Sequence, residues 1–387
     1  MVSSSCKKPV ETQEVSSRLA SRIAILSPWY PRHGHHAANT DAMYSQLRAE
    51  GYDVLLISPW SAAKKEKSLG TFFPTRSQPL MKSSIVKVLT TTYCLVLLIA
   101  MRLFSKRPVL AHCIDASYGP LIFAVAALKQ KISYLSLGNA TPTPYEKGLK
   151  QALQRGLSII AETDSIKRSW EDLHPSSTTT VPVAIDDVPS PRDKRESKAN
   201  LKIPEESVVL LFFGTHREDK NYETPIAAVS KEKLQTRTIW LLFAGPTVSG
   251  ESPATKVARA HFTNATVLDR FVDPDKVDSI FAASDIVVLS YGADYNKGSA
   301  VLLQAAAYLR PLLVSGPGYL ENFVKAYSIG ESFAASDPED FFRGLCRLIQ
   351  RSEQDPEWFQ AGFAKVRSEH SWKALIPQYL KVWQRQV

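Results

Sequence analysis

Two short segments of this sequence contain residue types that bind phosphate groups. In the first, Gly298 and Ser299 precede an apolar stretch, residues 300–309, that is typical of a helix. Backbone amides at a helix start carry partial positive charge, and a Gly-Ser start lets an anion approach them closely. In the second, Arg217 and Lys220 lie shortly after Gly214. An Arg can bind a phosphate through two N–H groups and a Lys adds a mobile charge, so the two segments together predict a diphosphate site.

Each segment follows a predicted strand. Residues 208–213 (VVLLFF) and 286–289 (IVVL) are apolar without alternation, which is typical of strands buried on both faces of a parallel sheet. In such sheets, ligands bind beyond the carboxyl ends of the strands. The alternative is an ordinary strand-helix-strand unit in which Arg217 and Lys220 lie on the surface and pair with Glu218 and Asp219.

The elements that would position this site recur along the chain as strands alternating with helices, which indicates an α/β fold with doubly wound parallel sheets. A stretch rich in charge and Pro, residues 187–206, is interpreted as a linker. It separates a first domain, residues 21–186, from a second, residues 207–387, and residues 1–20 form a polar tail without the apolar core of a signal peptide. Strands are predicted at 23–26, 54–57, 109–112, 132–135, 157–161, 180–183, 208–213, 240–244, 265–268, 286–289 and 312–314.

Four segments of the second half resemble the retaining glycosyltransferases of family 4, which have the GT-B fold. They are FFGTHREDKNYETPIAAV, FVDPDKVDSIFAASDIVVLSY, GSAVLLQAAAYLRPLLVS and HSWKALIPQYLKVW. The likeness extends to the first half, over about residues 20 to 386 in all. It implies two Rossmann-like domains facing a cleft, with a closing helix that returns to the first domain. It also implies transfer of a sugar from a nucleotide diphosphate donor, which is a substrate, so that no cofactor is expected.

The resemblance assigns roles to particular residues. Asn139, Arg217 and Lys220 are the catalytic candidates, and His35 and Asp115 are acceptor-side candidates; Asp115 could equally cap the helix that follows it. The donor-binding candidates are Gly34, Gly214, Arg217, Lys220, Phe271, Asn296, Gly298, Ser299 and Gln304. The loop that contains Gly34 also contains three His residues, but their spacing matches no common zinc motif, and no metal is expected.

The sequence departs from the family pattern at three of these positions. Asn296 and Gln304 replace a pair of Glu residues, and Asn139 stands near the place of a His beside the reacting sugar. A Gln carbonyl can still accept a hydrogen bond from a ribose hydroxyl, whereas Asn cannot act as a general base at neutral pH. The alternative function is therefore a catalytically silent relative that binds a nucleotide-sugar or a partner glycosyltransferase. A GT-B epimerase is a third interpretation, but no acid-base carboxylates could be assigned to it.

Charge and cysteine content indicate which partners and compartment to expect. The net charge of +9 favours anionic partners: the nucleotide-sugar, a lipid phosphate or a membrane surface. The acceptor could be a glycan, a lipid-linked sugar or a small molecule. The sequence has no nucleic-acid-binding motif, so specific nucleic-acid binding is not expected. Four scattered Cys residues indicate reduced thiols and a cytoplasmic location, with peripheral membrane attachment left open.

The apolar segment 85–104 is ambiguous with respect to a membrane. It is nearly long enough to span a bilayer, but Lys87 and three Thr residues argue against spanning. Basic residues flank an apolar body, so the segment could also lie in the membrane interface. We rank a core helix first, an interfacial helix second and a spanning helix third.

Overall fold

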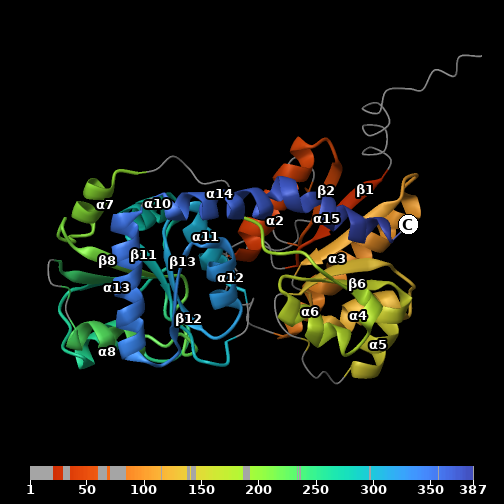
Figure 1. Ribbon diagram of the computed structural model, residues 1–387. Coiled ribbons are helices and arrows are strands. Elements are labelled where there is room, and N and C mark those ends of the chain that lie inside the picture. Colours follow the sequence, from red (N-terminus) through yellow and green to blue (C-terminus); the bar gives the residue numbers. More distant parts are fainter. Residues whose placement is uncertain are drawn as a thin grey trace, which may run out of the picture. The chain divides into compact units, whose positions relative to one another are not determined.

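The computed structural model divides the chain into two compact units (Figure 1). Unit 1 comprises Met1–Ala184 and Trp372–Val387, and unit 2 comprises Ile185–Ser371. The structure describes residues 21–28, 35–59, 68–69, 84–114, 116–136, 140, 145–185, 192–232, 234, 237–295, 298–355 and 357–386. The predicted tail, residues 1–20, lies outside these residues.

Unit 1 is built on a seven-stranded parallel sheet with the order β3-β2-β1-β4-β5-β6-β7. Its strands are β1 (Arg22–Leu26), β2 (Asp53–Ile57), β3 (Ser68–Leu69), β4 (Val109–Ile114), β5 (Ile132–Ser136), β6 (Leu157–Ala161) and β7 (Thr178–Thr180). The last strand was predicted at 180–183 and is found two residues earlier. The reason is that its partner β6 ends at Ala161, which pairs with Thr180, and the contact with β6 ends with the Val181 amide, which donates to the Ala161 carbonyl at 2.9 Å.

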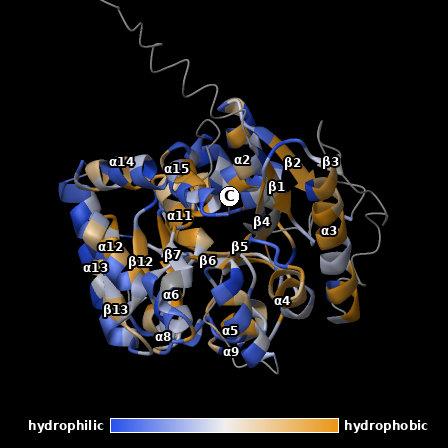
Figure 2. Ribbon diagram, turned by 90° about the vertical axis from the view of Figure 1, so that its right-hand side faces the viewer, coloured by the Kyte–Doolittle hydropathy of each residue, from blue (hydrophilic) through white to orange (hydrophobic). Residues whose placement is uncertain are grey.

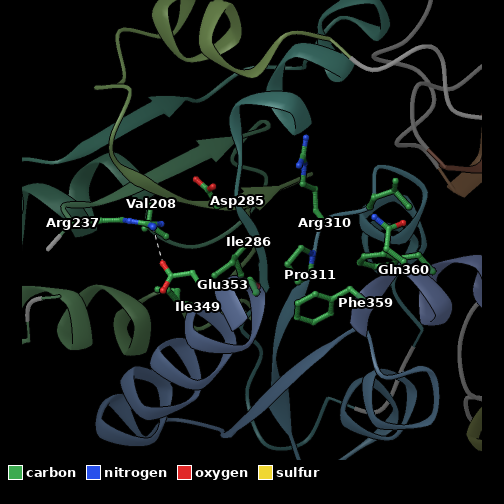
Figure 3. A pocket seen from close by; sticks show the side chains of 13 residues that line it. Val208, Arg237, Asp285, Ile286, Arg310, Pro311, Ile349, Glu353, Phe359 and Gln360 are labelled. Atoms are coloured by element: carbon green, nitrogen blue, oxygen red, sulfur yellow. Dashed lines mark ion pairs between the residues drawn. The ribbon is translucent and has the colours of Figure 1, made fainter. Parts of the chain in front are cut away.

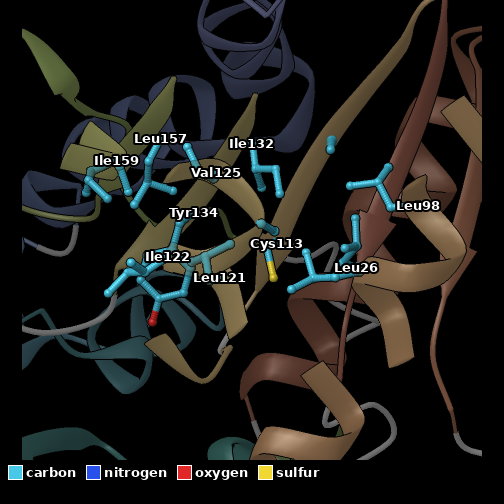
Figure 4. Packing of buried hydrophobic residues seen from close by; sticks show 14 of the residues in the cluster. Leu26, Leu98, Cys113, Leu121, Ile122, Val125, Ile132, Tyr134, Leu157 and Ile159 are labelled. Carbon is cyan, nitrogen blue, oxygen red and sulfur yellow. The ribbon is translucent and has the colours of Figure 1, made fainter. Parts of the chain in front are cut away.

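Two hydrophobic clusters pack in unit 1 against its sheet and helices. One includes buried residues of α3 (Ser84–Phe104), α4 (Tyr118–Ala126), α5 (Glu146–Arg155) and α6 (Asp164–Glu171), and Figure 4 shows part of it around Cys113 and Tyr134. The other includes residues of α2 (His35–Ala49) and the C-terminal helix α15 (Trp372–Gln384). Gln386, just after α15, donates to and accepts from the backbone of Ala111 in β4 at 2.9 and 2.8 Å. The last helix of the chain is thus part of unit 1.

The apolar helix α3 is only partly a core helix. Its buried residues are Thr90, Thr91, Cys94, Leu95 and Leu98, and only 28% of its most apolar window is buried. Among the described residues it is the single helix long and apolar enough to cross a membrane, by length and composition alone. The inner side of α3 thus packs within unit 1 while its outer side is exposed, and the interpretations that concern a membrane stay predictions. The segment is mainly apolar but contains Lys87 and three Thr residues, and two of these Thr lie on the covered side, so polarity alone does not indicate which side the domain covers.

Unit 2 contains a six-stranded parallel sheet with the order β10-β9-β8-β11-β12-β13. Its strands are β8 (Val208–Phe213), β9 (Ile239–Ala244), β10 (Ala265–Leu268), β11 (Ile286–Leu289), β12 (Leu312–Gly316) and β13 (Gly330–Ala334). Its helices are α7 (Lys194–Asn200), α8 (Glu223–Lys231), α9 (Pro253–Arg259), α10 (Pro274–Ala283), α11 (Ala300–Ala307), α12 (Tyr319–Tyr327), α13 (Pro338–Gln354) and α14 (Trp358–His370). The strand order reverses between β8 and β11, the position at which ligands bind in open α/β sheets.

The stretch predicted as a linker, residues 187–206, differs from that expectation because it contains α7. Asp193 caps this helix by accepting a hydrogen bond from the Glu196 amide at 2.7 Å. The Lys198 ammonium is buried and donates to the carbonyls of Glu205 and Ser207 at 2.8 and 2.7 Å. The Asp285 carboxylate also lies 3.7 Å from this ammonium, so the buried charge is paired, and a charge-rich composition alone does not reveal this.

Candidate functional site

The loop after β8 begins with a close approach between two backbone segments. Gly214 has a φ of +85°, and its amide donates to the Ala244 carbonyl at 2.9 Å. Gly245, the residue that follows β9, has a φ of +148°, and a Cβ there would lie only 2.1 Å from the Gly214 carbonyl oxygen. Both positions require glycine, one for its left-handed conformation and the other also for lack of space. The two glycines fix where the loop leaves the sheet.

Arg217 and Lys220 lie on this loop in different environments. Arg217 is partly exposed, and its Nε and Nη2 donate to the two carboxylate oxygens of Asp219 at 3.0 and 2.9 Å. Lys220 is only 7% exposed, and its ammonium donates to the Phe213 carbonyl at 3.0 Å. Burial and then the positive charge of Arg217 lower the pKa of Lys220 to about 7, and Asp219 opposes this shift. The loop therefore holds two cationic side chains and a carboxylate that pairs with one of them.

The loop after β11 brings two tyrosines next to this charge. Tyr291 forms an isolated antiparallel bridge with Lys220, and its ring stacks on that of Tyr295 at 3.7 Å between centroids. The Tyr295 hydroxyl donates to the Gly298 carbonyl at 2.9 Å, which fixes the Gly-Ser turn. Burial raises the pKa of both tyrosines, and Arg217 is among the nearby charges that act on each. Both rings thus remain neutral phenols that can donate hydrogen bonds at neutral pH.

The start of α11 faces the first loop. Ser299 is buried and precedes the helix, but its side chain does not cap α11 and instead hydrogen-bonds Tyr291. A Cβ at Gly214 would lie 3.5 Å from the Val301 side chain and 3.9 Å from the Lys220 ammonium. The two predicted phosphate-binding segments are therefore neighbours at the carboxyl ends of β8 and β11, where the strand order reverses.

The first loop also contains His216, which was not selected from the sequence. Its Nδ1 lies 2.7 Å from the Tyr222 hydroxyl, and its buried Nε2 has no hydrogen-bond partner among the described residues. Burial and then the charge of Lys220 lower the pKa of His216 to about 4, so the ring is neutral at neutral pH. Its position three residues after a buried strand was the available signal, as it was for Tyr291, two residues after β11.

Gln304 and Phe271 lie on elements of the same unit. Gln304 is half-buried on α11, and Phe271 is exposed just after the carboxyl end of β10. Gly34, Asp115, Asn139 and Asn296 lie outside the residues that the structure describes, and of His35 only the backbone is described, as the first residue of α2. The roles assigned to these residues stay predictions.

A cavity of about 320 Å³ in unit 2 lies at the opposite edge of the sheet, at the amino ends of β8, β11 and β12 (Figure 3). Its charged groups have partners within the protein. Arg237 pairs with Glu353 at 2.7 Å, Arg310 donates to the Phe281 carbonyl at 2.8 Å, and Asp285 accepts from the Val209 amide at 2.8 Å. This cavity is therefore not the candidate site. In the described part of the chain, no cluster of His, Cys, Asp and Glu could hold a metal ion.

Comparison with known proteins bears on the fold and on the part of the chain that contains both loops. Residues 193–364, which include both loops, match the family model described as Glycosyl transferases group 1. The two parallel-sheet units and the solved structures described below show that the chain has the GT-B fold. The expected fold class and strand alternation are thus confirmed.

The relatives found by sequence comparison have low sequence identity to this chain. The chain is 26% identical to a D-inositol 3-phosphate glycosyltransferase from a Nocardioides species, over 69% of this chain and 62% of that protein. It is 25% identical to a D-inositol 3-phosphate glycosyltransferase from Catenulispora acidiphila, over 69% of this chain and 66% of that protein. The match thus spans slightly less than two thirds of the length of either relative.

Solved structures are similar over nearly the whole chain. A glycosyltransferase from Rickettsia africae has a TM-score of 0.71 at 12% identity, covering 95% of this chain and 98% of that one. Sucrose-phosphate synthase from Thermosynechococcus elongatus has a TM-score of 0.66 at 16% identity, covering 94% and 98%. HepE from Anabaena in complex with UDP has a TM-score of 0.68 at 12% identity, covering 94% and 100%. At these identities the likeness concerns the fold.

Proposed function

We propose that this protein transfers a sugar from a nucleotide diphosphate donor to an acceptor, and that unit 2 binds the donor. Arg217 and Lys220 neutralise the charge that develops on the leaving diphosphate, and the first amides of α11 after Gly298 and Ser299 assist them. Gln304 accepts a hydrogen bond from the ribose, and Phe271 lies beside the base. Transfer proceeds with retention at the anomeric carbon, as in the family 4 enzymes that the sequence resembles.

The observation that carries this proposal is the buried ammonium of Lys220 between the two loops. Burial of an ammonium is costly, and one backbone carbonyl at 3.0 Å compensates for it only in part. Arg217 beside it adds to the cost by repulsion, while Asp219 already engages two of the five N–H donors of Arg217. An anion bound between Lys220 and the start of α11 would relieve both costs, which is the behaviour of a diphosphate site.

The first domain would present the acceptor from Gly34, His35, Asp115 and Asn139. Relatives named for D-inositol 3-phosphate make this compound the first acceptor to test. One structural neighbour was solved with UDP-2-fluoro glucose, so UDP-glucose is the first donor. A glycan or a lipid-linked sugar follows in the acceptor panel.

A catalytically silent relative is the second candidate. It is favoured by the uncharged Asn296 and Gln304 at positions where the family pattern has Glu, and by Asn139 near the place of the family His. Such a protein would bind the nucleotide-sugar through Arg217 and Lys220 without transferring it. Wild-type protein that binds a donor but neither transfers nor hydrolyses it, across the acceptor panel, would establish this alternative.

The decisive experiment for the site compares UDP with uridine in calorimetric titrations, after a donor screen has identified the base. We expect Arg217→Ala and Lys220→Ala each to weaken UDP binding by about 1.5 to 3 kcal/mol, the range for a hydrogen bond to a charged group, and to leave uridine binding nearly unchanged. Arg237→Ala is the matched control, because Arg237 is an ion-paired arginine of unit 2 at the opposite edge of the sheet. Equal losses for UDP and uridine would exclude the assigned roles.

A further inference from the structure

The outer side of α3 forms an apolar surface together with α4 and the residues that follow α4. Figure 2 shows hydrophobic residues along α3 and over α4. We call this surface the α3 face. Its exposed apolar residues are Ile85, Val88, Leu89, Val96, Leu103, Phe104, Phe123, Leu128 and Tyr145. Isolated exposed apolar residues are normal on soluble proteins, but a contiguous group on one helix marks an interaction surface.

A groove of about 460 Å³ runs along the α3 face between α3 and α4. Val88 and Val96 line it from α3, and Phe123, Leu128 and Tyr145 line the other side. The groove is almost entirely apolar, and only a few hydroxyl groups, such as that of Thr92, face it. An apolar groove of this kind fits hydrocarbon rather than a charged ligand.

Hydrogen bonds join the inner side of α3 to strands of the sheet, to the residue before α4 and to the residue before β5. The Cys94 thiol donates to the Ile57 carbonyl at 3.6 Å, and Thr91 accepts from the Ser117 amide at 3.0 Å. Arg102, near the end of the helix, donates to the carbonyls of Val109 and Lys131, each at 2.8 Å. A spanning helix would have to break these bonds, whereas a helix lying in the membrane plane keeps all of them and inserts only its outer side.

The end of α3 leads into a basic groove of about 780 Å³. Phe104, the last residue of α3, is 86% exposed and lines this groove. The charged residues that line it are Arg22, Arg48, Asp53, Lys106 and Arg107. Asp53 is the one carboxylate among them, and it pairs with Arg22 at 2.8 Å. The apolar α3 face thus continues into a strongly positive surface.

We propose that unit 1 docks on an anionic lipid bilayer through the α3 face, with the basic groove at the end of α3 against the lipid phosphates. The adjoining apolar and basic surfaces match the two layers of a membrane interface, in which acyl chains lie beneath charged headgroups. A protein partner would have to present an apolar surface to the α3 face and an adjoining acidic surface to the basic groove. This inference does not depend on the proposed transfer reaction, because membrane binding is measured without donor or acceptor.

The test is flotation of the purified full-length protein with vesicles of phosphatidylserine and phosphatidylcholine. We expect binding at low salt that weakens as salt rises, because the screening length falls to about 10 Å at 0.1 M. Vesicles of phosphatidylcholine alone should bind much more weakly. Val96→Glu should raise the lipid concentration for half-maximal binding at least about tenfold, since it removes a buried apolar side chain from the docked state.

Two matched controls separate docking from general effects of charge. Val96 is 57% exposed, and Val248 of unit 2 is 59% exposed, so Val248→Glu makes the same change away from the α3 face and should leave binding unaltered. The pair Lys106→Glu and Arg107→Glu should weaken binding by at least about 25-fold, since each basic side chain near an anionic surface contributes about fivefold. The exposed pair Arg259→Glu and Lys276→Glu, in unit 2, changes net charge equally and should have little effect.

Each alternative explanation of the α3 face predicts a distinct result that would overturn the proposal. Flotation that survives high salt and alkaline extraction would indicate a spanning helix. A dimer in sedimentation analysis that Val96→Glu dissociates, without flotation, would indicate a second copy of the chain. Absence of flotation together with slow hydrogen exchange on α3 would indicate that another segment of this chain covers it.

Discussion

The buried Lys220 makes a specific prediction about the pH dependence of diphosphate binding. With a pKa of about 7, this amine is half charged at pH 7 in the unbound protein and about 1% charged at pH 9. A diphosphate binds the protein with Lys220 protonated, so at higher pH the amine must take up a proton from solution when the diphosphate binds. If only the charged form binds, the affinity for UDP falls about 50-fold between pH 7 and pH 9, or about 2.3 kcal/mol.

The assay is calorimetric titration of UDP at pH 7, 8 and 9 in two buffers of different ionisation enthalpy. We expect uptake of nearly one proton per UDP at pH 9, and almost no pH dependence in Lys220→Met, which lacks the amine. His216 does not contribute over this range, because its pKa of about 4 keeps the ring neutral throughout. A UDP affinity that is flat from pH 7 to pH 9 in the wild type, or an unchanged slope in Lys220→Met, would refute the reasoning.

The lowered pKa of Lys220 affects the stability of the unbound protein in the opposite direction: stability rises with pH. The folded protein loses the Lys220 proton near pH 7, whereas the unfolded chain keeps it to about pH 10. Lys220 therefore makes the unbound protein more stable as the pH rises from about 7 to about 10, because the unfolded state binds the extra proton. Stability and UDP affinity should thus change in opposite directions over this range, which a general alkaline effect on the fold would not produce.

Two further predictions concern the geometry of the two loops. Gly245→Ala should lower the urea midpoint of unfolding and weaken UDP binding, because its Cβ would lie 2.1 Å from the Gly214 carbonyl oxygen. The control is Gly292→Ala, whose Cβ would meet no atom within 4 Å and which should change neither quantity. Equal effects of the two substitutions would contradict the argument. Gln304→Ala should weaken donor binding and transfer together, whereas Gln304→Glu should keep measurable affinity for the donor. Transfer kinetics and calorimetric titrations check this, and unchanged donor binding in Gln304→Ala would show that Gln304 does not bind the ribose.

The sequence by itself indicated most strands of the two sheets, with β3 and β13 missed, and it placed the candidate residues of unit 2 after two of those strands. The runs at 208–213 and 286–289 are strands with these same bounds, because a parallel strand buried on both faces is apolar throughout. Polar residues directly after such strands must lie at the carboxyl edge of the sheet, where ligands bind. For that reason Arg217, Lys220, Gly298 and Ser299 could be selected without coordinates.

Short elements and the pairing of side chains depended on the tertiary structure. The strand β13 contains Gly, Glu and Ser and forms because β12 offers it a partner, and its propensity alone does not predict it. Tyr291 and Tyr295 belong to the candidate site because the loop after β11 stacks their rings on each other and pairs the backbone of Tyr291 with that of Lys220. No spacing rule indicates that contact, since it depends on the path of an irregular loop.

Tertiary structure alone also decided which charged and apolar groups are buried. Lys220 reads as a surface residue in a polar run, yet the fold covers it and thereby lowers its pKa. The helix α3 is mainly apolar in sequence, yet the fold covers only one side and leaves Val96 and Phe104 exposed. Burial depends on which elements of the fold meet a given side chain, and that is set by contacts between residues far apart in the chain.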